Sequence, residues 1–386
     1  MKILHLIRDH QVIERTLGIY EKLFPGSNIV LIVSNAREIR HLKKYADSRV
    51  ITNDNVDQIG ASFDFSVITH VIAHYMAINT IRFIHYVPIG IDVTWEIYGA
   101  DLYNQFLLPF GYPVYYEDPS RYPDRHFVLK RYLTSFYRLI ERLFYKQPIT
   151  REDTEAYFKE ITSRVDSLQY CCKNDARLVE LYSGRSIPSY EIFNYSLHEV
   201  LGDLYDSPFN KGADIMVGNS SSFSNNHMYL IDYLRLLLEG DERIIIPLSY
   251  GGTRRYAKKV QIEYKKAFGE RVLPLLDYMP LHEYNKLLTS VNSIVLGNWR
   301  QEAQGTAIMG FYLGAKVFMS EKSPLFHWFK ELHFHVFPIE SASKGDLEKP
   351  LSEIERRHNR QLVIDYYNEN VLEERLIAHF SPKVNS

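Results

Sequence analysis

Residues 213–248, ADIMVGNSSSFSNNHMYLIDYLRLLLEGDERIIIPL, contain one complete strand–helix–strand pattern. Residues 214–217 and 243–248 are short apolar runs, and residues 226–239 repeat apolar side chains at helical spacing. Two strands joined by a helix are typical of a parallel sheet that helices cover. The stretch therefore predicts an α/β domain in this part of the chain.

The same alternation continues on both sides of this stretch. Downstream, strand-like runs at residues 272–275, 293–296 and 316–319 alternate with helix-like segments at 256–268, 281–290 and 305–313. Upstream, residues 2–8, 28–34, 66–70 and 93–98 are predicted strands, and a helix-like segment lies at 74–83. We predict two α/β halves joined near residue 200. Ligands are expected at the carboxyl ends of the strands, in the cleft between the halves.

The composition is that of a globular protein long enough for two domains. The 386 residues include 45 Lys or Arg and 47 Asp or Glu, so the net charge is −2. This balance argues against a nucleic-acid-binding protein, which usually has a large basic excess. Cys171 and Cys172 are adjacent and cannot build a disulfide framework, which favours a reducing cytosol. The most apolar long window, residues 66–87, is too polar to span a membrane.

One basic segment differs from this overall balance. Residues 121–151 contain eight Lys or Arg and two acidic residues, and residues 126–146 have the spacing of an amphipathic helix. A basic, aromatic-rich helix favours anionic lipid headgroups, so a peripheral position on a membrane is expected. The predicted docking residues are Lys130, Arg131, Arg138 and Arg142. A surface helix with a solvated charged face is the alternative.

The loop after residues 214–217 is the first candidate for a ligand site. A buried strand that ends in Gly, Ser and Asn just before a helix presents free backbone N–H groups and hydroxyls, which favour a phosphate. The candidate residues are Gly218, Asn219, Ser220, Ser224, Asn225 and His227. An ordinary loop with an Asn or Ser N-cap is the alternative.

Two further strand ends carry side chains suited to a nucleotide. Residues 298–307, NWRQEAQGTA, follow an apolar strand and precede a helix. Gly305 and Thr306 suit a phosphate at the helix start, and Arg300 suits a diphosphate. Gln301 lies in the same turn, and Tyr250 is expected to stack on a base or a sugar. A capped helix with surface charges and a turn with a packed tyrosine are the alternatives.

Two carboxylates lie at the carboxyl end of a predicted strand of the first half, residues 93–98. In residues 95–103, WEIYGADLY, Glu96 and Asp101 are candidates for a general base or for binding sugar hydroxyls. The alternative for Asp101 is a helix cap for residues 102–110. The sequence has no Asp-x-Asp pair, no P-loop and no Cys/His zinc spacing, so we expect neither a metal nor a cofactor.

Four motifs in order resemble one family. They are residues 98–103 (YGADLY), 217–220 (VGNS) with 224–227 (SNNH), 246–250 (IPLSY), and Arg300-Gln301 with Gly305-Thr306. This set resembles the bacterial TDP-N-acetylfucosamine:lipid II N-acetylfucosaminyltransferases, also called 4-alpha-L-fucosyltransferases, between about residues 66 and 330. Glu96 stands where that family has a histidine, and residues 111–123 look inserted.

The resemblance implies a GT-B-type glycosyltransferase with two Rossmann-like domains facing a central cleft. We expect an acceptor domain at residues 1–205, a nucleotide-sugar domain at 206–350, and a helical tail at 351–386 that packs back on the first domain. The implied reaction moves a 4-acetamido-4,6-dideoxyhexose, or a related deoxyhexose, from a dTDP-sugar or other nucleotide sugar. The implied acceptor is a polyprenyl-diphosphate-linked saccharide on the cytoplasmic face of the membrane. A nucleotide-sugar 2-epimerase and a non-catalytic nucleotide-sugar-binding protein are the alternatives.

Overall fold

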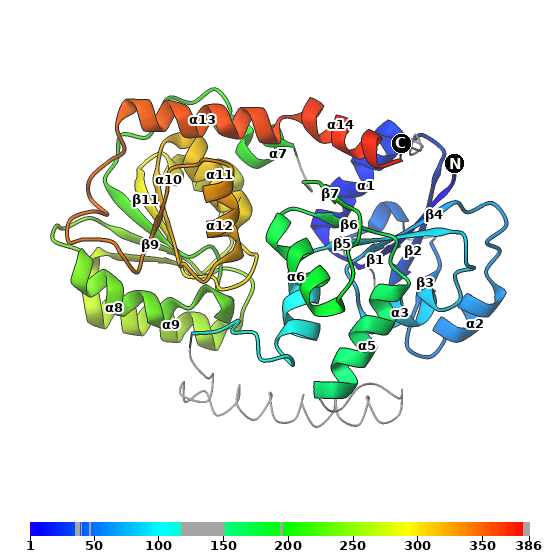
Figure 1. Cartoon of the computed structure of the whole chain (residues 1–386). Coiled ribbons are helices and arrows are strands. Elements are labelled where there is room, and N and C mark those ends of the chain that lie inside the picture. Colours follow the sequence, from blue (N-terminus) through cyan, green and yellow to red (C-terminus); the bar gives the residue numbers. More distant parts are fainter. Residues whose placement is uncertain (35–38, 40, 46–47, 117–150, 194–195, 381–386) are drawn as a thin grey trace. The chain divides into compact units, whose positions relative to one another are not determined.

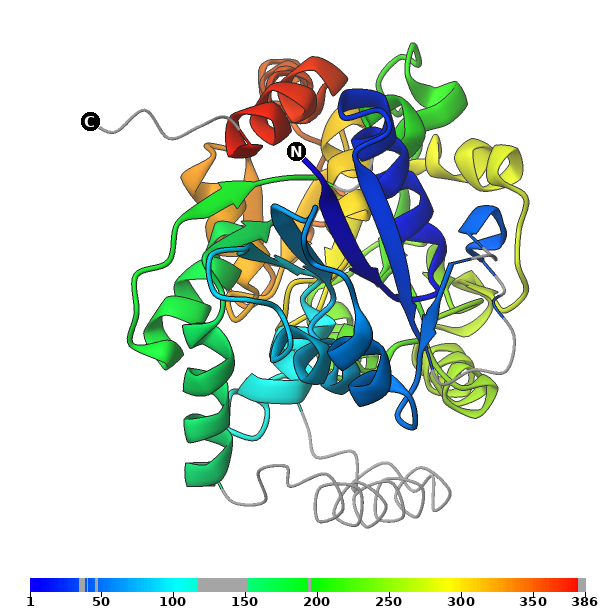
Figure 2. The same cartoon turned by 90° about the vertical axis from the view of Figure 1, so that its right-hand side faces the viewer.

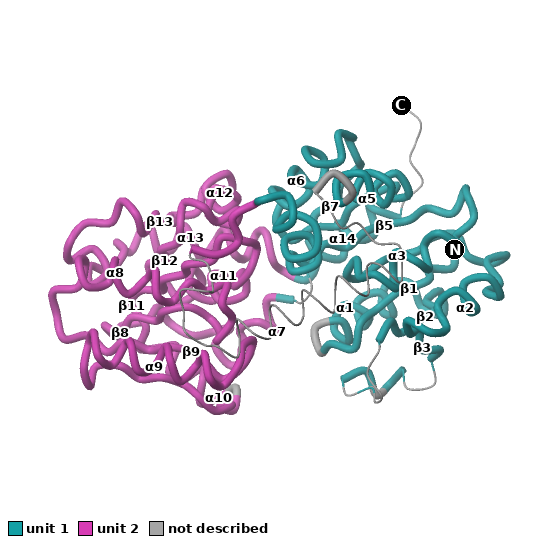
Figure 3. Tube along the Cα trace, turned by 90° about the horizontal axis from the view of Figure 1, so that it is seen from below, with its two compact units in different colours: residues 1–111, 147–196, 369–386 teal, residues 112–146, 197–368 magenta. Residues whose placement is uncertain are grey.

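The computed structural model describes residues 1–34, 39, 41–45, 48–116, 151–193 and 196–380. The chain forms two compact units (Figure 3): unit 1 holds residues 1–111, 147–196 and 369–386, and unit 2 holds 112–146 and 197–368. The change from one unit to the other falls at residue 196 rather than at the expected 205. The C-terminal region is also divided, because α13 (Glu353–Tyr367) belongs to unit 2 and α14 (Glu369–Phe380) to unit 1.

Unit 1 is built on a seven-stranded parallel sheet in the order β3-β2-β1-β4-β5-β6-β7 (Figure 2). Its strands are β1 (Ile3–Ile7), β2 (Asn28–Val33), β3 (Val50–Ile51), β4 (His70–His74), β5 (Asp92–Ile97), β6 (Ser167–Tyr170) and β7 (Ser189–Glu191). Its helices include α1 (Gln11–Leu23), α2 (Val56–Ser62), α3 (Ile78–Ile84), α5 (Arg151–Ser163), α6 (Lys173–Ser183) and α14. Every residue of β1 is buried, as expected of a strand covered on both faces.

Unit 2 is built on a six-stranded parallel sheet in the order β10-β9-β8-β11-β12-β13 (Figure 1). Its strands are β8 (Asp214–Val217), β9 (Ile244–Pro247), β10 (Val272–Leu275), β11 (Val291–Leu296), β12 (Lys316–Met319) and β13 (Val336–Pro338). The α-helices among its described residues are α7 (Leu197–Leu201), α8 (His227–Leu237), α9 (Arg254–Phe268), α10 (Leu281–Leu288), α11 (Gln304–Leu313), α12 (Pro324–Glu331) and α13. The strand order reverses between β8 and β11, and ligands of such sheets bind outside the strand ends at that point.

The structure shifts two elements that the sequence predicted in the first half. Strand β4 is His70–His74 instead of residues 66–70, and α3 begins at Ile78 instead of residue 74. The sequence predicted that the strand ends at the polar residue His70. The strand instead continues to His74, which is buried inside the sheet because its ring contacts two other polar side chains there.

The predicted basic helix, residues 126–146, and its docking residues Lys130, Arg131, Arg138 and Arg142 lie outside the described residues. In the part of the chain that the structure describes, no helix combines the length and the apolar character that crossing a membrane requires.

Candidate functional site

The chain turns sharply at Gly218, directly after β8. Gly218 has a φ of +71°, a conformation that side chains with a Cβ rarely adopt. A Cβ there would lie 2.9 Å from Asn225 Oδ1 and 3.0 Å from His227 Nε2. The Gly218 backbone N–H donates to Val295 of β11 over 2.8 Å, which fixes the loop at the point where the strand order reverses.

Asn225 holds the loop together from inside. Its buried side chain accepts a hydrogen bond from the Asn219 backbone N–H (2.9 Å) and donates one to Ser220 Oγ (3.1 Å). The structure therefore uses Asn225 and Ser220 to shape the loop. Asn219 points its amide toward the Tyr250 hydroxyl over 3.4 Å, and Tyr250 itself is 59% exposed. These two residues remain available to a ligand.

The loop after β11 presents a guanidinium next to the same site. Arg300 directs Nε and Nη2 at one carboxylate oxygen of Glu302, each over 3.0 Å, and the same oxygen accepts a hydrogen bond from Ser224. The Arg300 side chain is 12% exposed. Its remaining nitrogen, Nη1, is buried and has no hydrogen-bond partner among the described residues. Glu302 was not predicted, although its place two residues after Arg300 is visible in the sequence.

Helix α11 begins beside this arginine. Residue Ala303 precedes it with a φ of +68°, no side chain caps it, and its first turn holds no acidic residue. Thr306 is buried, Gly305 is partly exposed, and the Gln301 amide meets the Gln304 side chain over 3.4 Å. A helix start of this kind favours an anion through its backbone N–H groups and its dipole.

A cavity of about 360 Å³ adjoins the Gly218 loop. It is lined by residues that follow β9 and β10 and by the first turns of α9, among them Ser221, Gly252, Arg254, Lys258 and Tyr278. Gly252 is required here, because a Cβ would lie 1.9 Å from the Ser221 carbonyl oxygen. The sequence analysis identified the strand end and turn at residues 246–250, but not the residues of α9 and of the segment after β10 that also line the cavity. The Gly-Gly pair followed by basic residues was the available signal.

His227 was predicted to bind the donor, but the structure encloses it completely. Its Nδ1 lies 3.3 Å from the Tyr256 hydroxyl. Burial lowers the pKa of His227 to about 3, so the ring is neutral near pH 7. We assign it to the floor beneath Gly218, which it approaches with Nε2.

This histidine predicts a pH dependence of stability. The unfolded chain binds a proton at residue 227 below a pKa of about 6.5, and the folded protein does so only near pH 3. Acidification therefore favours unfolding, and His227 should remove about 2 kcal/mol between pH 7 and pH 5. We expect the unfolding free energy of His227→Gln, measured by urea denaturation, to decrease less than that of the wild type as the pH is lowered from about 7 to about 5. The difference between the two slopes should correspond to about one bound proton. Parallel pH curves for the two proteins would contradict this assignment.

In unit 1, Asp101 is buried and hydrogen-bonded, unlike the accessible general base that the sequence predicted. Its carboxylate is fully buried and accepts hydrogen bonds from Trp95 Nε1 (2.8 Å) and from the backbone N–H groups of Met76 (3.0 Å) and Tyr98 (3.1 Å). Burial raises the pKa of Asp101, and the hydrogen bonds from Met76 and Trp95 oppose the rise. Asp101 directly precedes the helical turn Leu102–Leu107, but its side chain does not cap that turn. Asp101 thus joins the ends of β4 and β5, with both oxygens occupied.

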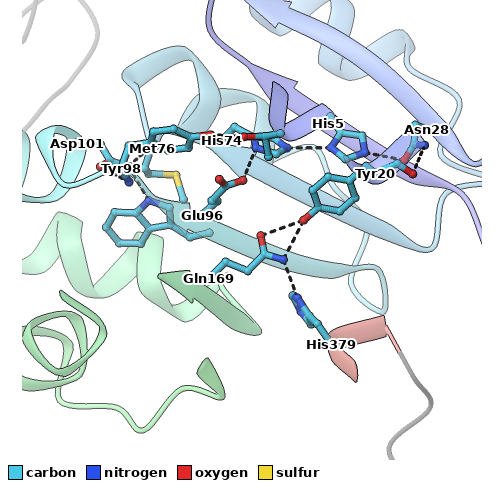
Figure 4. A network of polar contacts seen from close by, with 12 residues as sticks. His5, Tyr20, Asn28, His74, Met76, Glu96, Tyr98, Asp101, Gln169 and His379 are labelled. Carbon is cyan, nitrogen blue, oxygen red and sulfur yellow. Dashed lines mark hydrogen bonds and ion pairs between the residues drawn. The ribbon is translucent and has the colours of Figure 1, made fainter. Parts of the chain in front are cut away.

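Glu96 lies at the end of a buried chain of polar contacts (Figure 4). Asn28 donates to two backbone carbonyls at the end of α1, so its oxygen accepts from His5 Nε2 over 3.0 Å. Burial, then the neighbouring His74, lowers the pKa of His5 to about 3, so His5 is neutral and its Nδ1 accepts from His74 Nε2 over 2.8 Å. His74 Nδ1 then faces Glu96. One further proton must lie between these two groups, because otherwise two acceptors would meet.

A second arm of this network comes from the C-terminal helix. Gln169 of β6 exchanges hydrogen bonds with the Tyr20 hydroxyl and contacts His379 Nδ1 over 2.8 Å (Figure 4). His379 belongs to α14, and its Nε2 lies 3.1 Å from Ser167 Oγ. The sequence analysis did not identify these residues, because their partners are up to 212 positions apart.

The second half of the chain matches a known protein family. Residues 201–380 match the model of the family described as 4-alpha-L-fucosyltransferase glycosyl transferase group 56, which confirms the resemblance of the motifs in this region. The motif at residues 98–103 lies outside the match.

Solved structures share the fold over nearly the whole chain. A glycosyltransferase from Rickettsia africae is 12% identical, with a TM-score of 0.59 over 98% of this chain and 97% of that one. Anabaena HepE in complex with UDP and glucose is also 12% identical, with a TM-score of 0.59 over 99% of both chains. Sucrose-phosphate synthase from Thermosynechococcus elongatus is 10% identical, with a TM-score of 0.60 over 98% of both chains. At such identities the likeness shows the GT-B fold alone.

Proposed function

We propose that the chain, a GT-B glycosyltransferase whose residues 201–380 match the 4-alpha-L-fucosyltransferase family, takes its sugar from a dTDP-sugar. The sugar is a 4-acetamido-4,6-dideoxyhexose or a related deoxyhexose. The acceptor is a saccharide linked to a polyprenyl diphosphate, and the enzyme works at the cytoplasmic face of the membrane. The basic composition of residues 121–151 supports this location.

The observation that carries the donor site is the free nitrogen of Arg300. A buried guanidinium N–H without an acceptor is costly, and a phosphate oxygen would satisfy it. The Gly218 loop and the start of α11 supply further N–H donors at the strand-order reversal. Anabaena HepE, which has the same fold, was solved with UDP, also a nucleoside diphosphate. We assign the diphosphate to this position and the nucleoside to the cavity beside Tyr250 and Tyr278.

The chemistry follows from this arrangement. As the sugar leaves, negative charge develops on the nucleoside diphosphate, and fixed donors stabilise it without reorganising. Arg300, Gly305 and Thr306 serve this purpose in the proposed site. In unit 1, two buried carboxylates support the acceptor site: Glu96 from strand β5 and Asp101 from the segment that follows it.

Titration calorimetry with dTDP and UDP tests the proposal. We expect the folded protein to bind a nucleoside diphosphate at least about tenfold more tightly than the matching monophosphate, because the monophosphate lacks one of the phosphate groups that would contact Arg300. Product analysis with the nucleotide sugar, with and without a lipid-linked acceptor, then identifies the reaction. Absence of nucleotide binding would refute the proposal. A changed sugar in the absence of acceptor would indicate an epimerase.

A further inference from the structure

Glu302 holds Arg300 from one side only. Three donors converge on a single Glu302 oxygen, Oε2: Arg300 Nε, Arg300 Nη2 and the Ser224 hydroxyl. The Glu302 side chain is 16% exposed and that of Arg300 12%. A mostly buried ion pair of this kind is sensitive to its geometry, because water cannot replace a lost contact.

This contact fixes the direction of the guanidinium. The group is planar, so bonding at Nε and Nη2 determines where Nη1 points. Nη1 is the nitrogen that the described residues leave without an acceptor. Without Glu302, Arg300 would lose the bond at Nε and would be free to turn about its side-chain torsions.

The same carboxylate also joins two loops of unit 2. Ser224 belongs to the segment after β8, and its hydroxyl additionally contacts Ser222 Oγ over 2.7 Å. Arg300 and Glu302 belong to the segment after β11. The two segments on either side of the strand-order reversal are thus tied through one oxygen atom.

We propose that Glu302 is a positioning residue, which orients Arg300 so that Nη1 meets a phosphate of the ligand while Glu302 itself does not contact it. This inference rests on the proposed function, since it assigns the phosphate to Arg300. A carboxylate near a phosphate repels it, so Glu302 contributes only through the arginine that neutralises it.

A double-mutant cycle tests the proposal. Affinity for dTDP, UDP and inorganic pyrophosphate is measured by calorimetry for the wild type, Arg300→Gln, Glu302→Ala and the double variant. We expect Glu302→Ala to weaken binding about tenfold in the wild type and less than about twofold in the Arg300→Gln background. Glu302→Gln should stay within about threefold of the wild type, because its amide oxygen can replace Oε2 as the acceptor.

Each outcome decides one question. An equal loss in both backgrounds would overturn the inference, because Glu302 would then act on the ligand or the loop independently of Arg300. Binding of pyrophosphate but of no nucleotide would refute the proposed function and leave the cycle to decide the role of Glu302. Absence of binding of all three probes would refute both.

Glu353→Ala is the matched control. Glu353 pairs with Arg357 on α13 in the same unit, with both side chains exposed. We expect no change in affinity. Thermal unfolding of each variant shows whether a lost affinity reflects a lost fold.

Discussion

Replacing Arg300 with glutamine is expected to lower kcat/KM for the nucleotide-sugar donor about a hundredfold. The change removes the buried N–H that we assign to the diphosphate and leaves the Glu302 carboxylate without its cation. Because negative charge grows on the leaving diphosphate, kcat should fall as well as donor affinity. Steady-state kinetics with varied donor and saturating acceptor would measure both.

Arg243→Gln is the control for this variant. Arg243 also forms an ion pair in unit 2, with the carboxylate of Asp214. This pair lies where β8 and β9 begin, whereas the proposed site lies beyond the ends of the strands. Its side chain is 46% exposed, so the substitution should leave kcat/KM within about twofold. Unchanged donor kinetics in Arg300→Gln would remove this residue from the proposed site.

Replacing Glu96 with alanine is expected to lower the unfolding free energy by about 3–5 kcal/mol. The change leaves the buried His74 without the group that shares its proton. Glu96→Gln should cost about 1 kcal/mol or less, because its amide N–H can donate to His74 Nδ1 in place of that proton. Urea denaturation of both variants would measure the difference.

Asp92→Ala provides the comparison, since Asp92 pairs with His70 on the same two strands but at their exposed ends. It should cost no more than about 0.5 kcal/mol. If Glu96→Gln is as unstable as Glu96→Ala, the shared proton is wrongly placed. If Glu96→Gln is stable but inactive, Glu96 acts in catalysis, as the sequence predicted.

The sequence allowed the loops of unit 2 to be predicted better than the polar network of unit 1, because the signals for these loops are local. Gly218, Arg300, Gly305 and Thr306 each follow a short apolar run and precede a helix, so their place at the strand ends can be read within about ten residues. The strand-order reversal that brings the two loops together follows from the parallel α/β pattern.

The buried network of unit 1 could not be predicted in this way. His5, His74 and Glu96 lie on three different strands, and each on its own looks like a polar interruption. Their burial depends on partners that only the folded sheet brings together, since a lone buried charge would be costly. Glu302 was overlooked for a related reason: a charged residue in a turn is usually solvated, and its contact with Ser224 spans 78 positions.

The return of α14 to unit 1 affects how such a chain can evolve. Because unit 1 is assembled from separate stretches of sequence, a single crossover near residue 196 would exchange more than unit 2. It would also bring in a foreign last helix, which would have to supply a partner for Gln169 where His379 now stands. Recombination that replaces unit 2 is therefore constrained by residues that are buried in unit 1.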